Sequence, residues 1–209
     1  MKQGTFITFE GCEGVGKSTQ IKRLQESLSQ QGKEVISLRE PGGTSIGETI
    51  RARLKSTNLD PLEELYQFNI ARYHLVTEVI APALESGKIV LCDRFTDSTI
   101  AYQEHGRGIN NYLVRFVIQV ATQGINPDLT FFLDAKPQIG LAHRINSTDP
   151  FEQENIEFHN RVYMSYKSII ALEPNRFRVI PYLEGNPEEM QSQIQQETNK
   201  YLEKTNRKN

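Results

Sequence analysis

One eight-residue segment constrains the fold of this chain more than any other: Gly11-Cys12-Glu13-Gly14-Val15-Gly16-Lys17-Ser18. It has the pattern G-x-x-x-x-G-K-[ST] and lies between a β-rich run at Thr5–Glu10 and a helical pattern at Lys17–Gln31. In that setting the glycines let backbone N–H groups converge on phosphates, and the helix N-terminus adds positive potential. The lysine can reach the β- and γ-phosphates. The segment therefore predicts a binding loop for a nucleoside triphosphate.

Short β-rich runs alternate with longer helical patterns along the whole chain. The predicted strands are Thr5–Glu10, Glu34–Leu38, Lys88–Asp93, Leu129–Asp134 and Phe177–Pro181. The predicted helices are Lys17–Gln31, Ile46–Lys55, Pro61–Glu85, Tyr112–Gln123, Pro137–Asn146, Phe151–Leu172 and Pro187–Glu203. This alternation predicts a three-layer α/β fold of the P-loop NTPase kind, with about five parallel strands flanked by helices. We expect residues 1–209 to form a single domain.

Composition excludes several classes of function. The chain has 24 Lys and Arg against 26 Asp and Glu, so its net charge is −2. This balance argues against a general nucleic-acid surface, and phosphates must meet locally placed cations. Two cysteines, Cys12 and Cys92, cannot form a disulfide framework and fit a reducing compartment. Without an 18-residue apolar run or a signal-peptide pattern, we expect a cytoplasmic protein that uses no membrane.

Charged residues follow the predicted strands, where parallel sheets bind ligands. The third strand ends in Asp93-Arg94, and the fourth ends in Asp134. An acid at such a position can hold Mg²⁺. We prefer Asp93 because Arg94 places a cation beside it, although an Asp–Arg surface pair would look the same. The segment Arg39-Glu40-Pro41-Gly42-Gly43-Thr44 predicts a second binding loop, and Arg51 fits a ligand contact or a solvated position equally well.

The predicted helix Pro61–Glu85 carries a cation within an apolar stripe. Arg72 shares a face with Leu65, Phe68, Leu75 and Val79, which recur at spacings of three and four. Burying an unpaired guanidinium is costly, so Arg72 either extends to water or meets a polar partner. Phe68, one turn earlier, is placed to stack on a flat ring whose edge Arg72 would bind. Base binding is thus one of two interpretations that the pattern leaves open.

Six segments, taken in order, resemble the bacterial type of thymidylate kinase, in the P-loop nucleoside monophosphate kinase superfamily: FEGCEGVGKST, REPGGT, FNIAR, DRFTDSTIAYQ, GRGI and PDLTFFLD. The resemblance covers nearly the whole chain. Only the phosphate loop is specific alone, whereas the order and spacing of all six are highly specific. The resemblance implies ATP-dependent phosphorylation of dTMP to dTDP for dTTP biosynthesis, by in-line phosphoryl transfer with Mg²⁺.

The resemblance places both nucleotides on numbered residues. ATP would be held by Gly11, Cys12, Glu13, Gly14, Val15, Gly16, Lys17, Ser18 and Thr19. Ser18 and Asp93 would bind Mg²⁺. The monophosphate of dTMP would be gripped by three arginines supported by Glu40: Arg39, Arg51 and Arg94. Glu13 would lie near the 3′-hydroxyl, and Tyr102 would crowd the 2′ position and favour deoxyribose.

The base of dTMP would be bound by residues from two segments. Phe68 would stack on thymine and Arg72 would bond its O4. Thr99, or Ser98 beside it, would reach the other polar edge together with Gln103. The resemblance thereby accounts for an arginine within an apolar stripe.

The resemblance also implies a small helical lid over ATP at residues 141–155. Some relatives carry an arginine in the phosphate loop, where this chain has Gly14. Bacterial relatives carry it in the lid, where this chain has Arg144, and Pro150 stands in place of an Asp-Arg pair. The predicted catalytic residues are therefore Lys17, Asp93, Arg94 and Arg144.

Two alternatives remain from the sequence. A deoxynucleoside kinase would also join a phosphate loop to an acid–Arg strand end, but it needs a base for a sugar hydroxyl and should accept thymidine. A non-catalytic ATP-binding switch would bind ATP and release no ADP when monophosphates are added.

Two predicted helices have more than one apolar side, which predicts a homodimer. The second apolar side of Pro61–Glu85 includes Tyr66, Tyr73, Val76 and Ile80. The helix Tyr112–Gln123 is apolar most of the way round, with Leu113, Val114, Phe116, Val117, Ile118 and Val120. Deep burial within one chain is the competing interpretation.

Arg144→Ala tests the lid arginine. An arginine that stabilises a transferring phosphoryl group contributes about 10³–10⁵ in rate. The substitution should lower kcat by at least ~10²-fold and barely change dTMP binding, because the contact forms in the transition state. Steady-state kinetics of the purified variant measures this. A loss of only two- to threefold would make Arg144 a solvated helix end.

Overall fold

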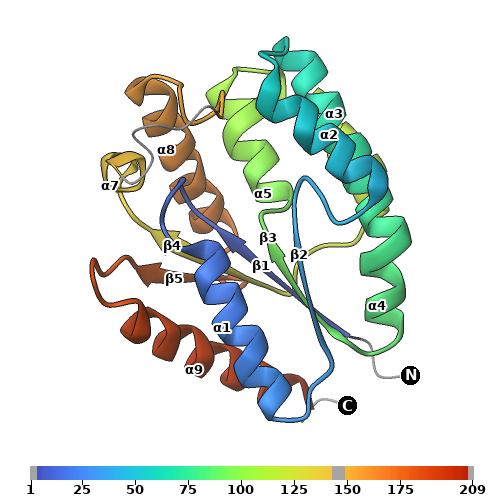
Figure 1. The fold of residues 1–209 in the computed structure, drawn as a ribbon, viewed down its shortest axis with the longest axis vertical. Helices are drawn as coiled ribbons and strands as arrows, with labels where there is room; N and C mark the ends of the chain where they lie inside the picture. Colours follow the sequence, from blue (N-terminus) through green and yellow to red (C-terminus); the bar gives the residue numbers. More distant parts are fainter. Residues whose placement is uncertain (1–3, 143–148, 207–209) are drawn as a thin grey trace.

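The computed structural model describes residues 4–142 and 149–206 and is built on one parallel sheet (Figure 1). Its strands, all mutually parallel in the order β2-β3-β1-β4-β5, are β1 Thr5–Glu10, β2 Val35–Arg39, β3 Ile89–Asp93, β4 Leu129–Asp134 and β5 Phe177–Pro181. In the central strand Ile7 pairs with Leu91 on one side and Leu129 on the other. The predicted α/β fold is confirmed, with strand bounds correct to within one residue.

Helices cover both faces of the sheet. In chain order they are α1 Lys17–Gln30, α2 Ser45–Ser56, α3 Pro61–Leu75, η1 Val76–Ile80, α4 Ala81–Glu85, α5 Thr96–Thr99, η2 Ile100–Gly106, α6 Asn111–Thr122, α7 Pro137–Ala142, α8 Ile156–Leu172 and α9 Pro187–Asn206. Successive strand residues face opposite cores. Ile7 packs with α1 and α9, whereas Phe6 packs with η1 on the other face. The sheet is therefore buried on both sides, as its apolar strands require.

Two helical segments differ from the predicted ones because they contain π-type turns. The predicted helix Pro61–Glu85 is continuous in space but widens at η1, just before Pro82, which lacks the N–H of a regular helix. The segment Thr96–Gly106, not predicted as a helix, is helical, and most of it is π-type. A wider turn departs from the 3.6-residue period by which a helix is recognised.

The helix predicted at Phe151–Leu172 begins five residues later, at Ile156. Asn155 caps it by accepting a hydrogen bond from the N–H of Phe158 at 2.8 Å. Before the cap, Asp149 accepts from the N–H of Phe151 at 3.1 Å and turns the chain. Phe151 consequently lies outside the helix. The predicted helix Pro137–Asn146 is described only as far as Ala142.

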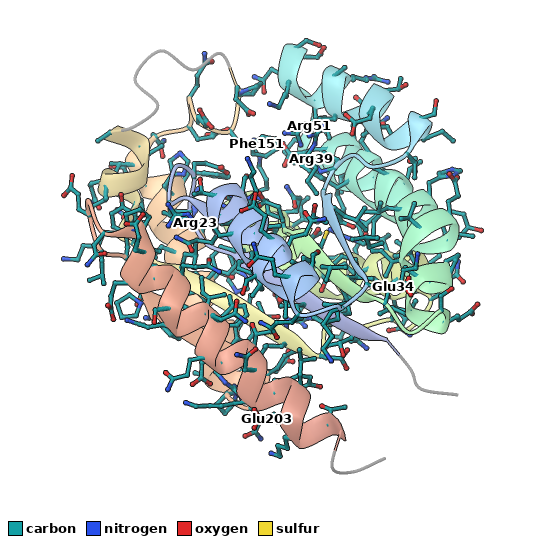
Figure 2. All side chains as sticks on the ribbon, turned by 60° about the horizontal axis from the view of Figure 1, so that its bottom comes forward. Arg23, Glu34, Arg39, Arg51, Phe151 and Glu203 are labelled. Atoms are coloured by element: carbon teal, nitrogen blue, oxygen red, sulfur yellow. The ribbon has the colours of Figure 1, made fainter. Side chains whose placement is uncertain are left out.

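The carboxyl ends of the strands meet along one edge of the sheet. Arg39, at the end of β2, lies there with Arg51 and Phe151, whereas Glu34, before β2, lies toward the opposite end (Figure 2). Within the described ranges, no helix is long and apolar enough to cross a membrane.

Candidate functional site

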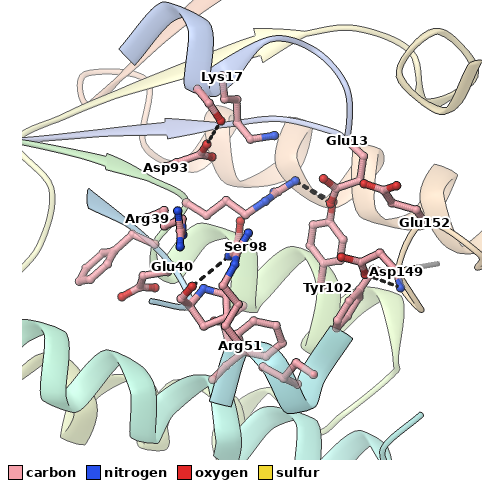
Figure 3. A pocket seen from close by; sticks show the side chains of 18 of the residues that line it. Glu13, Lys17, Arg39, Glu40, Arg51, Asp93, Ser98, Tyr102, Asp149 and Glu152 are labelled. Atoms are coloured by element: carbon pink, nitrogen blue, oxygen red, sulfur yellow. Dashed lines mark hydrogen bonds and ion pairs between the residues drawn. The ribbon is translucent and has the colours of Figure 1, made fainter. Parts of the chain in front are cut away.

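A cleft of about 600 Å³ opens at the carboxyl ends of β1, β2 and β3 (Figure 3). Every residue predicted to hold dTMP lines it, as do Lys17, Ser18, Thr19 and Asp93. Gly11 and Cys12 lie behind the lining, where their carbonyls accept hydrogen bonds from Lys17 Nζ at 3.1 and 2.8 Å. The fold thus gathers residues from five segments of the chain around one cavity: 13–19, 39–55, 68–72, 93–103 and 149–152.

The predicted phosphate loop joins β1 directly to α1. Gly16 caps α1 with φ +86°, a left-handed conformation that favours glycine. Lys17 begins the helix and is buried. Burial lowers the pKa of Lys17, and nearby Arg94 lowers it further, while Glu13 and Asp93 oppose the shift. The loop therefore presents a helix N-terminus and a lysine to the same end of the cleft.

The phosphate loop also contacts α7, and this contact depends on two glycines, Gly14 and Gly140. A Cβ on Gly14 would overlap the carbonyl oxygen of Gly140, and a Cβ on Gly140 would overlap that of Glu13. The phosphate loop and α7 are thus in backbone contact. The absence of an arginine at position 14 has a steric reason here, because no side chain fits without displacing α7.

Ser18 and Asp93, the two residues predicted to bind Mg²⁺, are in direct contact. Ser18 Oγ donates to Asp93 Oδ2 at 2.7 Å. The competing acid, Asp134, accepts from Tyr163 OH at 2.8 Å and Lys167 Nζ at 2.9 Å. A hydroxyl and a carboxylate are hard oxygen donors that suit Mg²⁺, which takes its other ligands from phosphates and water. The described residues contain no cluster of three acidic, His or Cys ligands that would hold a metal by themselves.

Arg94 lies at the centre of the cleft. Its backbone is left-handed, with φ 70°, and its N–H donates to Phe9 O at 2.9 Å. Its guanidinium donates to four oxygens: Glu13 Oε1 at 2.7 Å, Ser98 Oγ at 3.0 Å, Tyr166 OH at 3.2 Å and Tyr102 OH at 3.3 Å. Burial would lower the pKa of Arg94, but Glu13 and the surrounding oxygens hold it well above its ordinary value.

Glu13 is the counter-charge of Arg94. It also accepts from Tyr102 OH at 2.9 Å. Burial would raise the pKa of Glu13, but the charges of Arg94 and Lys17, with these hydrogen bonds, lower it to about 2. Glu13 therefore remains ionised across the physiological pH range.

Glu10 is a site residue that the sequence analysis missed. Its buried carboxylate, at the end of β1, accepts from Phe95 N at 2.8 Å, Ser98 Oγ at 2.6 Å and Tyr166 OH at 2.8 Å. Burial and the negative charge of Asp97 raise the pKa of Glu10 to about 7. Two of these partners also contact Arg94, so Glu10 fixes the wall against which Arg94 lies.

Arg72 is 2% exposed and meets polar partners on three sides. Glu40 Oε2 accepts from Nε at 2.8 Å and from Nη2 at 2.6 Å, and Phe95 O accepts from Nη2 at 3.1 Å. Asn69 Oδ1 accepts from Nη1 at 3.1 Å. A guanidinium has five N–H hydrogens. One, on Nη1, remains available at the wall of the cleft.

Glu40, predicted to support the phosphate-binding arginines, contacts Arg72 instead. Arg39 and Arg51, two of the arginines predicted to bind the monophosphate, do not pair with Glu40. Arg39 pairs with Glu48 at 3.0 Å, and Arg51 Nη1 donates to Pro41 O at 3.0 Å. Arg51 still lines the cleft, so the sequence ambiguity about its position is resolved in favour of the cavity.

Phe151 lines the cleft beside Phe68 and Tyr102, although sequence reasoning assigned it to a helix. Its ring centroid lies 5.7 Å from that of Phe68 and 6.0 Å from that of Tyr102. Asp149 and Glu152 flank it in the lining (Figure 3). The signal in the sequence is Asn155, a good N-cap, which places Phe151 before the helix. Arg144 lies outside the described residues.

Comparison with known proteins identifies the family. A sequence model described as thymidylate kinase matches residues 9–194. This chain belongs to the thymidylate kinase family. The thymidylate kinase of Synechococcus sp. (strain JA-3-3Ab) is 47% identical over 190 residues, covering 90% of this chain and 92% of that protein. The thymidylate kinase of Desulfovibrio desulfuricans is 40% identical over 214 residues, with coverage of 97% and 98%.

The fold agrees with that of a thymidylate kinase of known structure. The crystal structure of thymidylate kinase from Ehrlichia chaffeensis superposes with a TM-score of 0.80 at 34% identity, covering 94% of this chain and 99% of that chain. Membership of the thymidylate kinase family makes this chain a nucleotide-phosphorylating transferase that uses ATP.

Gly140→Ala tests the contact between α7 and the phosphate loop. The added Cβ meets a backbone carbonyl that has no rotamer by which to yield. We expect the free energy of unfolding to fall by about 1–3 kcal/mol, as for other overpacked contacts, and ATP to bind more weakly. Thermal denaturation and a titration with ATP measure the two effects. Gln138→Ala, at an exposed position of the same helix, is the matched control. An unchanged ATP affinity in Gly140→Ala would show that α7 does not shape the loop.

Proposed function

We propose that this chain transfers the γ-phosphoryl group of ATP to the phosphate of dTMP, giving ADP and dTDP, with Mg²⁺ beside Ser18 and Asp93. The observation that supports this most is the continuity of one cleft. It runs from the phosphate loop past Arg94 to a base end formed by Phe68, Arg72 and Gln103. A triphosphate and a nucleoside monophosphate can therefore lie end to end in it, with their phosphates meeting beside Arg94.

The transfer requires positioning and charge neutralisation more than proton abstraction. The attacking phosphate oxygen of dTMP is already an anion, so no protein base is needed. Lys17 would neutralise the β- and γ-phosphates, and Arg94 would hold the acceptor phosphate in line with them. Bound Mg²⁺ would neutralise charge that develops on the transferring group. Arg51 and Arg39 would bind the acceptor phosphate from the second loop.

The base end favours a 4-keto pyrimidine. Arg72 has one N–H left for an acceptor such as O4, because its other four are used within the chain. Phe68 would stack on the ring, and Tyr102, held by Glu13, would crowd a 2′-hydroxyl. Thr99, or Ser98 beside it, would reach the other polar edge of the base together with Gln103.

We infer that residues 1–209 act as one domain, and that residues 141–155 form a lid that delivers Arg144 to ATP. Exclusion of water by this lid would limit wasteful hydrolysis of ATP. A cytoplasmic location is supported by two unpaired, buried cysteines. Burial raises the pKa of Cys12 to about 11, which leaves its thiol protonated and unreactive at neutral pH.

We also propose a homodimer built on α3 and α6. Exposed apolar side chains align at helical spacing on both helices: Tyr66, Ile70 and Tyr73 on α3, and Tyr112, Phe116 and Val120 on α6. Phe116 is 66% exposed. Such a contiguous apolar surface is typical of an interface. Val76 and Ile80, predicted to belong to it, are instead fully buried against the sheet, because the π-type turn directs them inward.

Substrate preference tests the proposed activity. ADP formation should be fastest with dTMP, slower with dUMP, which lacks a methyl worth roughly 1–3 kcal/mol, and slowest with dCMP. The amino group of dCMP would face the remaining Arg72 N–H, two donors together. A coupled assay with these acceptors, thymidine and no acceptor measures the order. Phosphorylation of thymidine would indicate a deoxynucleoside kinase, and ATP binding without turnover would indicate a switch.

Phe116→Asp tests the dimer. A carboxylate cannot be buried unpaired at an apolar interface without a large cost. The wild-type protein should sediment at twice its chain mass of 23.9 kDa, and the variant should sediment as a single chain. Met164→Asp changes an equally exposed apolar residue on α8 and should leave the dimer intact. A wild-type protein of 23.9 kDa at micromolar concentration would refute the dimer.

A further inference from the structure

We propose that Glu64 and Arg107 set the hydrogen-bonding polarity of the base end, by holding the Gln103 side-chain amide so that its carbonyl oxygen faces the base. Neither Glu64 nor Arg107 lines the cleft. Both are therefore positioning residues, which act through Gln103. The inference rests on the proposed function and names the determinant that distinguishes thymine from cytosine.

The first step concerns the two atoms of the Gln103 amide. Gln103 lies on η2 and is 2% exposed, and Glu64 lies on α3 and is 3% exposed. Gln103 Nε2 donates to Glu64 Oε1 at 2.7 Å. An ionised carboxylate only accepts hydrogen bonds, so only the NH₂ group of the amide can face it. Gln103 lines the cleft, and the polar atom that it can offer there as an acceptor is Oε1.

The second step concerns what keeps Glu64 an acceptor. Arg107 Nη2 donates to Glu64 Oε2 at 3.0 Å, and its Nε lies 3.3 Å from both carboxylate oxygens. A guanidinium stays protonated and stabilises the negative charge of its partner. Arg107 is itself fixed by Glu154 and by the ring of Phe158, 4.8 Å from its guanidinium carbon. The carboxylate of Glu64 therefore has a permanent cation in contact with both of its oxygens.

The third step considers the free hydrogen-bonding groups of Gln103 and Arg72 together. Arg72 has one N–H available at the wall of the cleft, and Gln103 has one carbonyl oxygen. Thymine presents an acceptor, O4, beside a donor, N3–H, which complements this pair. Cytosine presents an amino group and an unprotonated N3. Its amino group, a donor, would face the N–H of Arg72, and its N3, an acceptor, would face the carbonyl oxygen of Gln103. An unmade hydrogen bond to a buried group is costly, which makes amide orientation a determinant of specificity.

Glu64→Gln is the direct test. A glutamine at position 64 can donate or accept, so the Gln103 amide is free to turn over. The ratio of kcat/KM for dTMP to that for dCMP should fall by about tenfold. Changes in the two KM values should account for more of this fall than changes in kcat. Glu63→Gln is the matched control, because Glu63 is 40% exposed and pairs with Arg53 outside the cleft. It should leave the ratio unchanged.

A double-mutant cycle separates positioning from a structural effect. In a Gln103→Ala background, Glu64→Gln should not narrow the ratio further, because the amide it orients is gone. Equal narrowing in both backgrounds would mean that Glu64 acts by another route and would overturn the proposal. If Glu64→Gln left the ratio of kcat/KM for dTMP to that for dCMP unchanged, the proposal would be overturned too. The proposed function would still stand in that case, provided that the wild-type protein prefers dTMP.

A crystal structure of the wild-type protein with dTMP tests the orientation of the Gln103 amide directly, and it does not depend on whether a variant folds. We expect Gln103 Oε1 within hydrogen-bonding distance of base N3, and Nε2 on Glu64. A Gln103 amide whose Nε2 contacts the base would contradict the inference. A wild-type enzyme with no preference for dTMP over dCMP would refute the proposed function together with it.

Discussion

The site depends on a single buried carboxylate, that of Glu10. It stands where β1 ends and the phosphate loop begins, and its hydrogen bonds reach Phe95 after β3, Ser98 in α5 and Tyr166 in α8. These three donors come from elements that the sheet alone would not hold together. Ser98 and Tyr166 could still pair with each other at 2.9 Å, but removing the carboxylate would leave the N–H of Phe95 and one of these hydroxyls without an acceptor, which costs about 1–3 kcal/mol for each group. The phosphate loop and the wall of the cleft against which Arg94 lies are thus fixed by one side chain.

Three buried or half-buried arginines around the cleft each have a glutamate partner: Arg94 with Glu13, Arg72 with Glu40, and Arg107 with Glu64. Under the proposed function, a protein with a net charge of −2 would bind two polyanionic nucleotides here, so its cations must be concentrated and yet not repel one another. Pairing solves both problems, because each glutamate neutralises its arginine and fixes its plane. Such pairs contribute little net stability, since desolvation offsets attraction. Their value lies in orienting the N–H groups that remain.

The sequence predicted the strands and the gathering of the site better than the contacts within it. Strand ends follow from apolar runs bounded by charged residues, and the common edge follows from parallel topology. The partner of Arg72 could not be predicted, because Glu40 is 32 residues away in the sequence. The two side chains meet only because of the course that the loop after β2 takes. Glu10 and Glu64 gave no signal, since nothing in a strand or helix pattern says which carboxylate is buried. The helical segment with Tyr102 and Gln103 was missed because π-type winding does not follow the 3.6-residue period of an α-helix.

If Arg94 holds the acceptor phosphate as proposed, its contacts make acceptor binding an exchange of partners. Four of its five N–H hydrogens are used by Glu13, Ser98, Tyr102 and Tyr166, which leaves only that on Nε. A phosphate can be bound by two N–H groups only if one of these partners withdraws. Glu13 is the partner that a phosphate replaces most readily, because both are anions and both prefer the same fork of the guanidinium. A displaced Glu13 would keep the hydroxyl of Tyr102 as a donor, and it could also accept from a sugar hydroxyl of the bound nucleotide. The same carboxylate can therefore hold Arg94 in place before the acceptor arrives and bind the sugar afterwards.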